Sequence, residues 1–136
     1  MNTEAELQSA LQDTTTWFVV GLRDNPAREA FGVALVLKGR GKRIVPIHPL
    51  AQTVHGEQGF ASIAAATEAL GPPDVVDVFV RSDLAGQIAD EAIAAGAGVV
   101  WFQIGVIDTA AAKRVEAAGI TMIMDRCPKI EYAMRR

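Results

Sequence analysis

The sequence predicts a single doubly wound α/β domain, in which helices cover both faces of a five-stranded parallel sheet. Two observations support this prediction. Five short apolar segments alternate with segments whose apolar residues recur at helical spacing. Each connection is long enough for a right-handed crossover between parallel strands. In such a fold, ligands bind beyond the carboxyl ends of the strands.

Capping residues and helix breakers set the expected boundaries. Thr3 and Glu6 have the spacing of a capping box, and glycine or proline follows most helical segments. Other residues suited to the start of a helix are Ser62, Ser82, Asp108 and Pro128. The expected strands are 17–20, 43–47, 75–80, 98–104 and 120–124. The expected helices are 4–11, one from about 30 to 39–41, 62–70, 82–95, 110–118 and a short one from 128.

Composition excludes several classes of protein. The 136 residues, half of them hydrophobic, fit one domain over 1–136. A net charge of −3 disfavours a nucleic-acid binder, which would present a basic face. No apolar run approaches the roughly 18 residues of a membrane span, and the acidic N-terminus lacks a signal-peptide pattern. A single cysteine excludes an internal disulfide and a multi-cysteine metal site. The expected location is the cytoplasm.

The loop after the first strand is the first candidate site. Gly21 ends the apolar run Trp17-Phe-Val-Val, at a turn that requires a positive φ or the absence of a side chain. A strand, a glycine, a loop and a helix together direct free backbone N–H groups at an anion, most often a phosphate. Arg23 and Arg28 add two cations, although both also fit solvated loop positions. The hypothesis is that this loop holds the diphosphate of a nucleotide.

Familiar nucleotide motifs are absent. Gly21 is followed by Leu22 rather than by G-x-G-x-x-G, and the second strand ends in Pro-Ile-His-Pro without an acid, so NAD is disfavoured. A Gly-Lys-Ser/Thr phosphate loop is also missing. A phosphate-accepting receiver domain would need an acid at the end of the third strand and a lysine after the fifth. The residues near these places are Arg81 and Arg126, so a receiver domain is excluded. The residues alone therefore indicate a nucleotide or another anion at the strand ends.

Six blocks of sequence make the prediction more specific. They are Val-Val-Gly-Leu, Phe-Gly-Val-Ala, Ile-Val-Pro-Ile-His-Pro, Val-Asp-Val-Phe-Val-Arg-Ser, Val-Trp-Phe-Gln-Ile-Gly-Val and Met-Asp-Arg-Cys-Pro-Lys-Ile-Glu. In this order and spacing, from about Trp17 to Tyr132, they resemble the small stand-alone CoA-binding protein family. Those proteins are similar to the N-terminal CoA-binding domain of succinyl-CoA synthetase. The resemblance implies a Rossmann-like fold that holds the ADP part of coenzyme A across the carboxyl ends of the strands.

The resemblance also implies which residues bind the ligand. Gly21 and Leu22 would lie against the diphosphate, and Arg81 would lie at the third-strand edge of the adenosine pocket. The residues implied at the second-strand edge of that pocket are Pro46, His48 and Pro49. The residues implied along the path of the pantetheine arm are Gln103, Gly105 and Val106.

The loop departs from the family pattern. The family usually has Gly-x-Ser-x-Lys-Pro, and here Arg23 and Asn25 occupy the places of the serine and the lysine. Arg23 can restore one phosphate contact, because arginine binds phosphate through two N–H groups. Ala30 stands where a serine is common, and His48 replaces the usual asparagine.

The sequence therefore predicts a protein that binds coenzyme A or an acyl-CoA without catalysis of its own and without a metal. A homodimer or an unidentified protein partner stays open, whereas nucleic acid and membranes are not expected. One alternative is an acyl- or thiol-transfer enzyme using Cys127, since a helix N-terminus and nearby cations lower the pKa of a thiol. We favour a packing role for Cys127. The other alternative is a regulatory or interaction module that kept the fold and lost the ligand.

Overall fold

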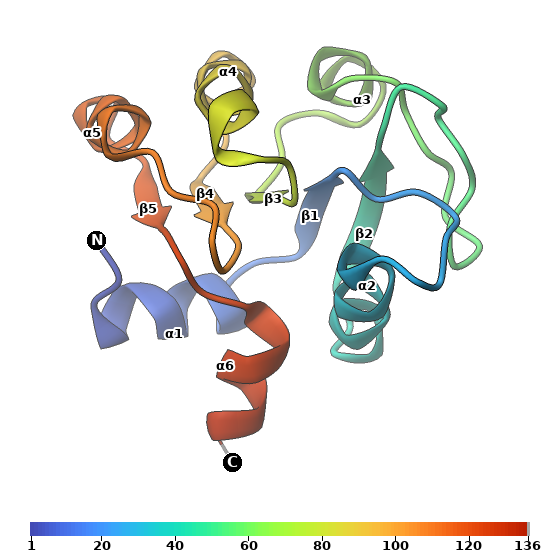
Figure 1. Ribbon diagram of the computed structural model, residues 1–136, viewed down its shortest axis with the longest axis horizontal. Helices are drawn as coiled ribbons and strands as arrows, with labels where there is room; N and C mark the ends of the chain where they lie inside the picture. The colour runs from blue at the N-terminus through green and yellow to red at the C-terminus, as the bar shows by residue number, and fades with distance from the viewer. Residues whose placement is uncertain (136) are drawn as a thin grey trace.

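The computed structural model describes residues 1–135 and shows a five-stranded, all-parallel sheet in the order β2-β1-β3-β4-β5. The strands are β1 (Thr16–Val20), β2 (Arg43–Ile47), β3 (Val75–Val78), β4 (Val99–Phe102) and β5 (Thr121–Ile123). The helices are α1 (Glu4–Gln12), α2 (Glu29–Gly39), α3 (Ile63–Leu70), α4 (Ser82–Ala94), α5 (Thr109–Ala117) and α6 (Pro128–Met134). The predicted doubly wound, Rossmann-like class is confirmed (Figure 1).

Most predicted helix starts are confirmed. Thr3 and Glu6 form the capping box of α1, and the side chains of Ser62 and Asp108 accept backbone N–H groups of α3 and α5. The prediction for Ser82 is wrong, because Arg81 takes the N-cap position of α4. The Ser82 hydroxyl instead joins the loop after β4, where it donates to one backbone carbonyl and accepts one N–H.

Two strands are shorter than predicted. The prediction for β3 extended to residue 80 and that for β4 to residue 104, whereas the ladders end at Val78 and Phe102. The N–H of Phe79 still bonds the Val20 carbonyl, and the N–H of Gln103 still bonds the Val78 carbonyl. The chain therefore leaves the sheet gradually at the carboxyl edge, and these extra residues become available to line a site there.

Each face of the sheet has its own apolar core (Figure 1). Phe18, Val76 and Phe102 pack beneath α3, α4 and α5. Trp17 and Trp101 pack on the opposite face beneath α1, α2 and α6, with ring centroids 5.7 Å apart. Alternate residues of one strand thus serve opposite cores, as expected for strands buried on both faces. Within residues 1–135, no helix combines the length and apolar character that crossing a membrane requires.

The two ends of the chain lie on the same side of the sheet and are tied together (Figure 1). The Asn2 side chain donates to the Met124 carbonyl and accepts the Met124 N–H, just beyond β5. The Tyr132 hydroxyl of α6 donates to the Leu11 carbonyl of α1 at 2.8 Å. The Tyr132 bond holds α6 against α1, and α6 also packs against α2.

The strand order places a switch point between β1 and β3, because the chain runs from β1 to β2 on one side and then returns to β3 on the other. Ligand sites of such sheets lie at this point, outside the carboxyl ends of the strands. Gly21 follows β1 there with a φ of +96°, and a Cβ at this position would lie 3.3 Å from the Phe79 carbonyl oxygen. The predicted need for glycine at this turn is confirmed.

Candidate functional site

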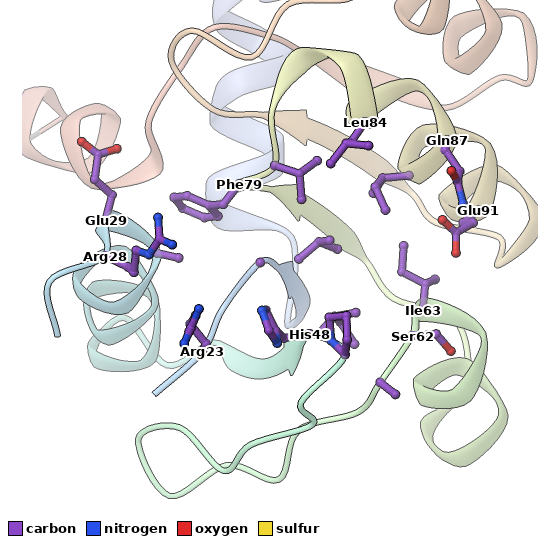
Figure 2. A pocket seen from close by; sticks show the side chains of 18 residues that line it. Arg23, Arg28, Glu29, His48, Ser62, Ile63, Phe79, Leu84, Gln87 and Glu91 are labelled. Atoms are coloured by element: carbon purple, nitrogen blue, oxygen red, sulfur yellow. The ribbon is translucent and has the colours of Figure 1, made fainter. Parts of the chain in front are cut away.

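A cavity of about 630 Å³ opens at the switch point, and we call it the first cavity (Figure 2). It lies between the carboxyl ends of β1, β2 and β3, the start of α2, and the facing sides of α3 and α4. The residues that line it are Val20, Gly21, Arg23, Arg28–Ala30, Ile47–Pro49, Ala61–Ile63, Phe79, Val80, Leu84, Gln87, Ile88 and Glu91. Arg23 and Arg28 make one end cationic, whereas the end between α3 and α4 combines the apolar residues Ile63 and Ile88 with the polar residues Ser62, Gln87 and Glu91 (Figure 2). The cavity therefore suits a ligand that joins a negatively charged part to a part with both apolar surface and polar groups.

Two guanidinium groups give the first cavity its positive end. Arg23 and Arg28 both line it, and neither forms an ion pair or a side-chain hydrogen bond with any residue in 1–135. Their charges therefore act on whatever enters the cavity. Figure 2 shows the Arg23 side chain toward His48 and the Arg28 side chain toward Phe79.

His48 is a neutral donor in this setting. Burial, and then the positive charges of Arg23 and Arg28, lower the pKa of its imidazole below the ordinary value of 6.5. The N–H of Leu50 donates to Nδ1 of the ring at 3.1 Å. Because Nδ1 accepts this bond, the proton of the neutral ring sits on Nε2. That nitrogen can donate to an anion in the cavity.

Backbone N–H groups add further donors. Within the described chain, the N–H groups of Leu22 and Arg23 in the loop, and of Glu29 and Ala30 in the first turn of α2, have no hydrogen-bond partner. Arg28, the N-cap of α2, makes no capping bond through its side chain. The helix start and the loop thus present unsatisfied donors beside two free cations, which is the arrangement that binds phosphate.

A second cavity of about 550 Å³ lies on the other side of the first residues of α2. Arg28 and Glu29 line both cavities, so the two spaces are neighbours. The remaining lining residues of the second cavity are Pro26, Ala27, Gly32, Val33, Gln103, Ile104, Cys127, Lys129 and Ile130. An extended ligand lying over the start of α2 would reach both.

A buried polar pair lies next to the second cavity. Gln103 donates its side-chain N–H to Oδ1 of Asp77, and both residues are buried. Burial raises the pKa of the Asp77 carboxyl to about 8, although the bond from Gln103 opposes this shift. Oδ2 of Asp77 has no partner. Gln103 was predicted as a site residue and Asp77 was not, although an acid stands inside the apolar run Val-Val-Asp-Val-Phe.

The structure brings together about half of the predicted site residues. Gly21, Arg23, Arg28, His48 and Pro49 line the first cavity, and Gln103 lines the second.

The other predicted residues lie outside the two linings. The Leu22 side chain is buried in the core, and Pro46 is a buried residue of β2. Arg81 is exposed and pairs with Asp83. The Asn25 side chain shapes the loop by accepting the Ala27 N–H.

Gly105 and Val106 also line neither cavity. The N–H of Gly105 donates to Asp125, and its carbonyl accepts the Ser82 hydroxyl. The Val106 side chain belongs to the core beneath α4 and α5. Cys127, in contrast, is half-buried at the N-cap of α6 and lines the second cavity.

Comparison with known proteins identifies the family. The model of the CoA binding domain matches residues 15–133. The uncharacterized protein YneT of Bacillus subtilis (strain 168) is 32% identical over 133 residues, which are 98% of this chain and 96% of YneT. A hypothetical protein from Pyrococcus horikoshii OT3 superimposes with a TM-score of 0.89 at 28% identity, covering 97% of this chain and 91% of that one. A Thermus thermophilus protein superimposes with a TM-score of 0.86 at 30% identity, covering 97% and 98% of the two chains. The chain therefore belongs to the family of CoA-binding domains, which the six blocks of its sequence resemble.

Proposed function

We propose that the protein binds coenzyme A or an acyl-CoA through its ADP part, with the diphosphate in the first cavity. One observation carries the proposal: two unpaired guanidinium groups and the unpartnered backbone N–H groups of three lining residues, Arg23, Glu29 and Ala30, belong to the same cavity at the switch point. Phosphate oxygens accept hydrogen bonds from both kinds of donor. Membership in the CoA-binding family favours coenzyme A over other diphosphates.

In this proposal, the two ends of the first cavity bind different parts of the ligand. At the cationic end, Arg23, Arg28 and Nε2 of His48 face the diphosphate. At the other end, Ile63 and Ile88 offer apolar surface between α3 and α4, which suits the faces of an adenine ring. Pockets for small ligands commonly combine such apolar walls with a few placed polar groups. The proposed role is binding, without catalysis by this chain.

Native mass spectrometry of freshly purified protein tests the proposal first, because bound coenzyme A would add a discrete mass. Calorimetric titration then compares coenzyme A, dephospho-CoA, ADP and NAD. We expect the first three to bind and NAD to bind more weakly. Equal binding of NAD would remove coenzyme A as the specific ligand. Equal affinity for coenzyme A and dephospho-CoA would show that the protein does not recognise the 3′-phosphate.

Arg23→Ala tests the site itself. A hydrogen bond to a charged group contributes about 1.5–3 kcal/mol, so ADP affinity should fall about 10- to 100-fold. Arg43→Ala is the matched control, because Arg43 is an exposed arginine at the amino end of β2, away from the carboxyl edge. If both variants bind ADP as tightly as the parent protein, the diphosphate does not lie in the first cavity.

Cys127 supports one rival function, thiol or acyl transfer, because it lines the second cavity. That function requires a thiolate, since the thiolate is the nucleophile. Iodoacetamide would then modify Cys127 rapidly well below the ordinary thiol pKa, and bound coenzyme A would protect it. An alkylation rate that follows an ordinary thiol, with or without coenzyme A, would eliminate transfer and leave binding as the function.

A further inference from the structure

We propose that Gln52 is a positioning residue, whose side chain holds the loop between β1 and α2 so that the Arg23 guanidinium group faces the first cavity. This inference rests on the proposed function, because the group that Arg23 would bind is the diphosphate of the ligand. Gln52 does not line the first cavity. It belongs to residues 48–62, which we call the β2–α3 loop, and residues 21–28 are the β1–α2 loop.

Two attachments hold the part of the β1–α2 loop that carries Arg23. On one side, the Leu22 side chain is buried in the core. On the other side, the N–H of Asp24 donates to Oε1 of Gln52 at 2.9 Å. Among residues 22–28 of the described chain, this is the only hydrogen bond to another loop or to a strand. Arg23 therefore stands between a buried side chain and a single bond from Gln52.

The backbone partner determines the direction of this bond. A backbone N–H group only donates, so the Gln52 amide must present its carbonyl oxygen to Asp24. The opposite orientation of the amide would place its NH₂ group against another donor. One arrangement of the amide therefore joins the two loops, which lie side by side (Figure 1).

The backbone of Gln52 is itself held in place by the β2–α3 loop. The N–H of Phe60 donates to the Pro46 carbonyl of β2 at 2.9 Å, and the Val54 side chain is fully buried. A Cβ at Gly59 would lie 2.1 Å from the Gln52 carbonyl oxygen, so the two backbone segments approach more closely than a side chain allows. Gln52 thus extends from a firmly packed support.

The same loop also supports α2, the helix that follows the β1–α2 loop. The Lys38 side chain of α2 donates to the His55 carbonyl. The His55 ring donates from Nε2 to the Phe31 carbonyl of α2 at 2.7 Å. The β2–α3 loop therefore contacts both the loop that carries Arg23 and the helix beyond it.

These contacts explain how Gln52 can raise affinity without touching the ligand. A guanidinium group that becomes ordered only on binding loses conformational freedom at that moment, and the loss weakens the complex. The Asp24 bond restricts the backbone beside Arg23 before the ligand arrives. The structure therefore assigns Gln52 a part in preparing the phosphate contact of Arg23.

Gln52→Met tests this role, because methionine has a similar length and lacks the acceptor. The variant should bind ADP about 2- to 10-fold more weakly in calorimetric titrations, as expected for one neutral hydrogen bond. Gln58→Met is the matched control, since Gln58 is an exposed residue of the same loop whose side chain makes no hydrogen bond within residues 1–135. Equal weakening in the two variants, or none in Gln52→Met, would overturn the inference.

A double-variant cycle separates positioning from a general loosening of the site. In the Arg23→Ala background, Gln52→Met should cost little further ADP affinity, because both changes act on the same phosphate contact. Fully additive losses would overturn the role of Gln52 in positioning Arg23. Absence of ADP binding to the parent protein would overturn the proposed function and this inference together, whereas additive losses leave the proposed function intact.

Amide hydrogen exchange, followed by NMR in the protein without ligand, measures the bond itself. Exchange of the Asp24 N–H should be faster in Gln52→Met than in the parent protein, and exchange of the Phe60 N–H should be unchanged. Unchanged exchange at Asp24 would overturn the inference, because the bond would then be absent in solution. Faster exchange at Phe60 as well would assign Gln52 to the stability of its own loop and would also overturn the inference.

Discussion

The two cavities beside α2 differ in where their polar groups lie. The first cavity has free cations and free N–H groups at its surface, with no carboxylate paired to either arginine in the described chain. The second is bordered by a neutral, buried pair, Asp77 and Gln103. The difference shows that the same helix start can separate two cavities with different polar groups. Arg23, Arg28 and His48 line the first cavity, whereas the second combines Arg28 and Lys129 with Gln103 of the buried, neutral pair.

The largest expected effect concerns Asp77, the buried acid beside the second cavity, and the pH dependence of stability that it causes. The folded pKa of Asp77 is about 8 against an ordinary value of 3.8, so between these values the folded state holds a proton that the unfolded state releases. The contribution of this proton to the free energy of unfolding is fully present below about pH 4, and it is lost as the pH rises through the folded pKa. The slope is at most about 1.4 kcal/mol per pH unit.

Urea unfolding of the parent protein and of Asp77→Asn between pH 4.5 and 8.5 measures that effect. Asparagine stays neutral at every pH, so the parent protein should lose stability relative to the variant as the pH rises. Asp83→Asn is the control, because Asp83 is exposed and paired only at the surface. Parallel stability curves for the parent protein and Asp77→Asn would show that Asp77 is already ionised at low pH.

The next largest effect concerns the two arginines of the first cavity. The double variant Arg23→Ala, Arg28→Ala should bind ADP at least about 100-fold more weakly, because two charge-assisted contacts are lost. The salt dependence of binding should also flatten, since exposed charges are screened by added salt. Titrations at low and high salt measure both. An unchanged salt dependence in the double variant would place the charge that attracts the ligand elsewhere.

A smaller effect separates His48 from the two arginines. Its pKa is lowered in the free protein by burial and by the positive neighbours, and a bound diphosphate would raise it. Binding then takes up a proton, so ADP affinity should rise about two- to threefold as the pH falls from 7.5 to 6. His48→Gln should remove this rise while keeping a donor. The same pH dependence in that variant would assign the proton to another group.

The smallest effect tests the boundary between the cavities. Glu29 contributes a carboxylate to both linings, although Figure 2 shows it turned away from Arg23 and His48. Exposed charge pairs contribute about 0–1 kcal/mol, so Glu29→Gln should tighten ADP binding by about twofold. Weaker binding in this variant would mean that Glu29 accepts a hydrogen bond from the ligand.

Local patterns explain why most of the fold was predictable. Apolar runs bounded by glycine or proline identified all five strands, and the capping residues Thr3, Ser62 and Asp108 identified helix starts. Ser82 misled because its hydroxyl bonds the loop after β4, a partner far away in sequence. The preference of serine for N-cap positions reflects hydrogen bonds to neighbouring backbone groups, and it does not account for a bond to a distant segment.

The site was predictable only where it depends on strand ends. Arg23 and Arg28 lie in the loop between β1 and α2, and His48 follows β2 directly, so the fold class alone brings them to one edge of the sheet. The second cavity depends on α6 packing against α2, a contact between segments about a hundred positions apart. The partner of Asp77 lies on another strand. Spacing along the chain carries no information about such contacts.

The ties between the two ends of the chain have a practical consequence. Asn2 and Leu11 touch neither cavity, yet they fasten Met124 and Tyr132, and between these two lies the segment that carries Cys127 and Lys129. Removing the first dozen residues to obtain a smaller domain would therefore remove the hydrogen bonds that hold this segment, which forms one side of the second cavity. A coenzyme A affinity measured on such a trimmed protein would therefore depend on the displaced residues of the second cavity as well as on the contacts with the nucleotide.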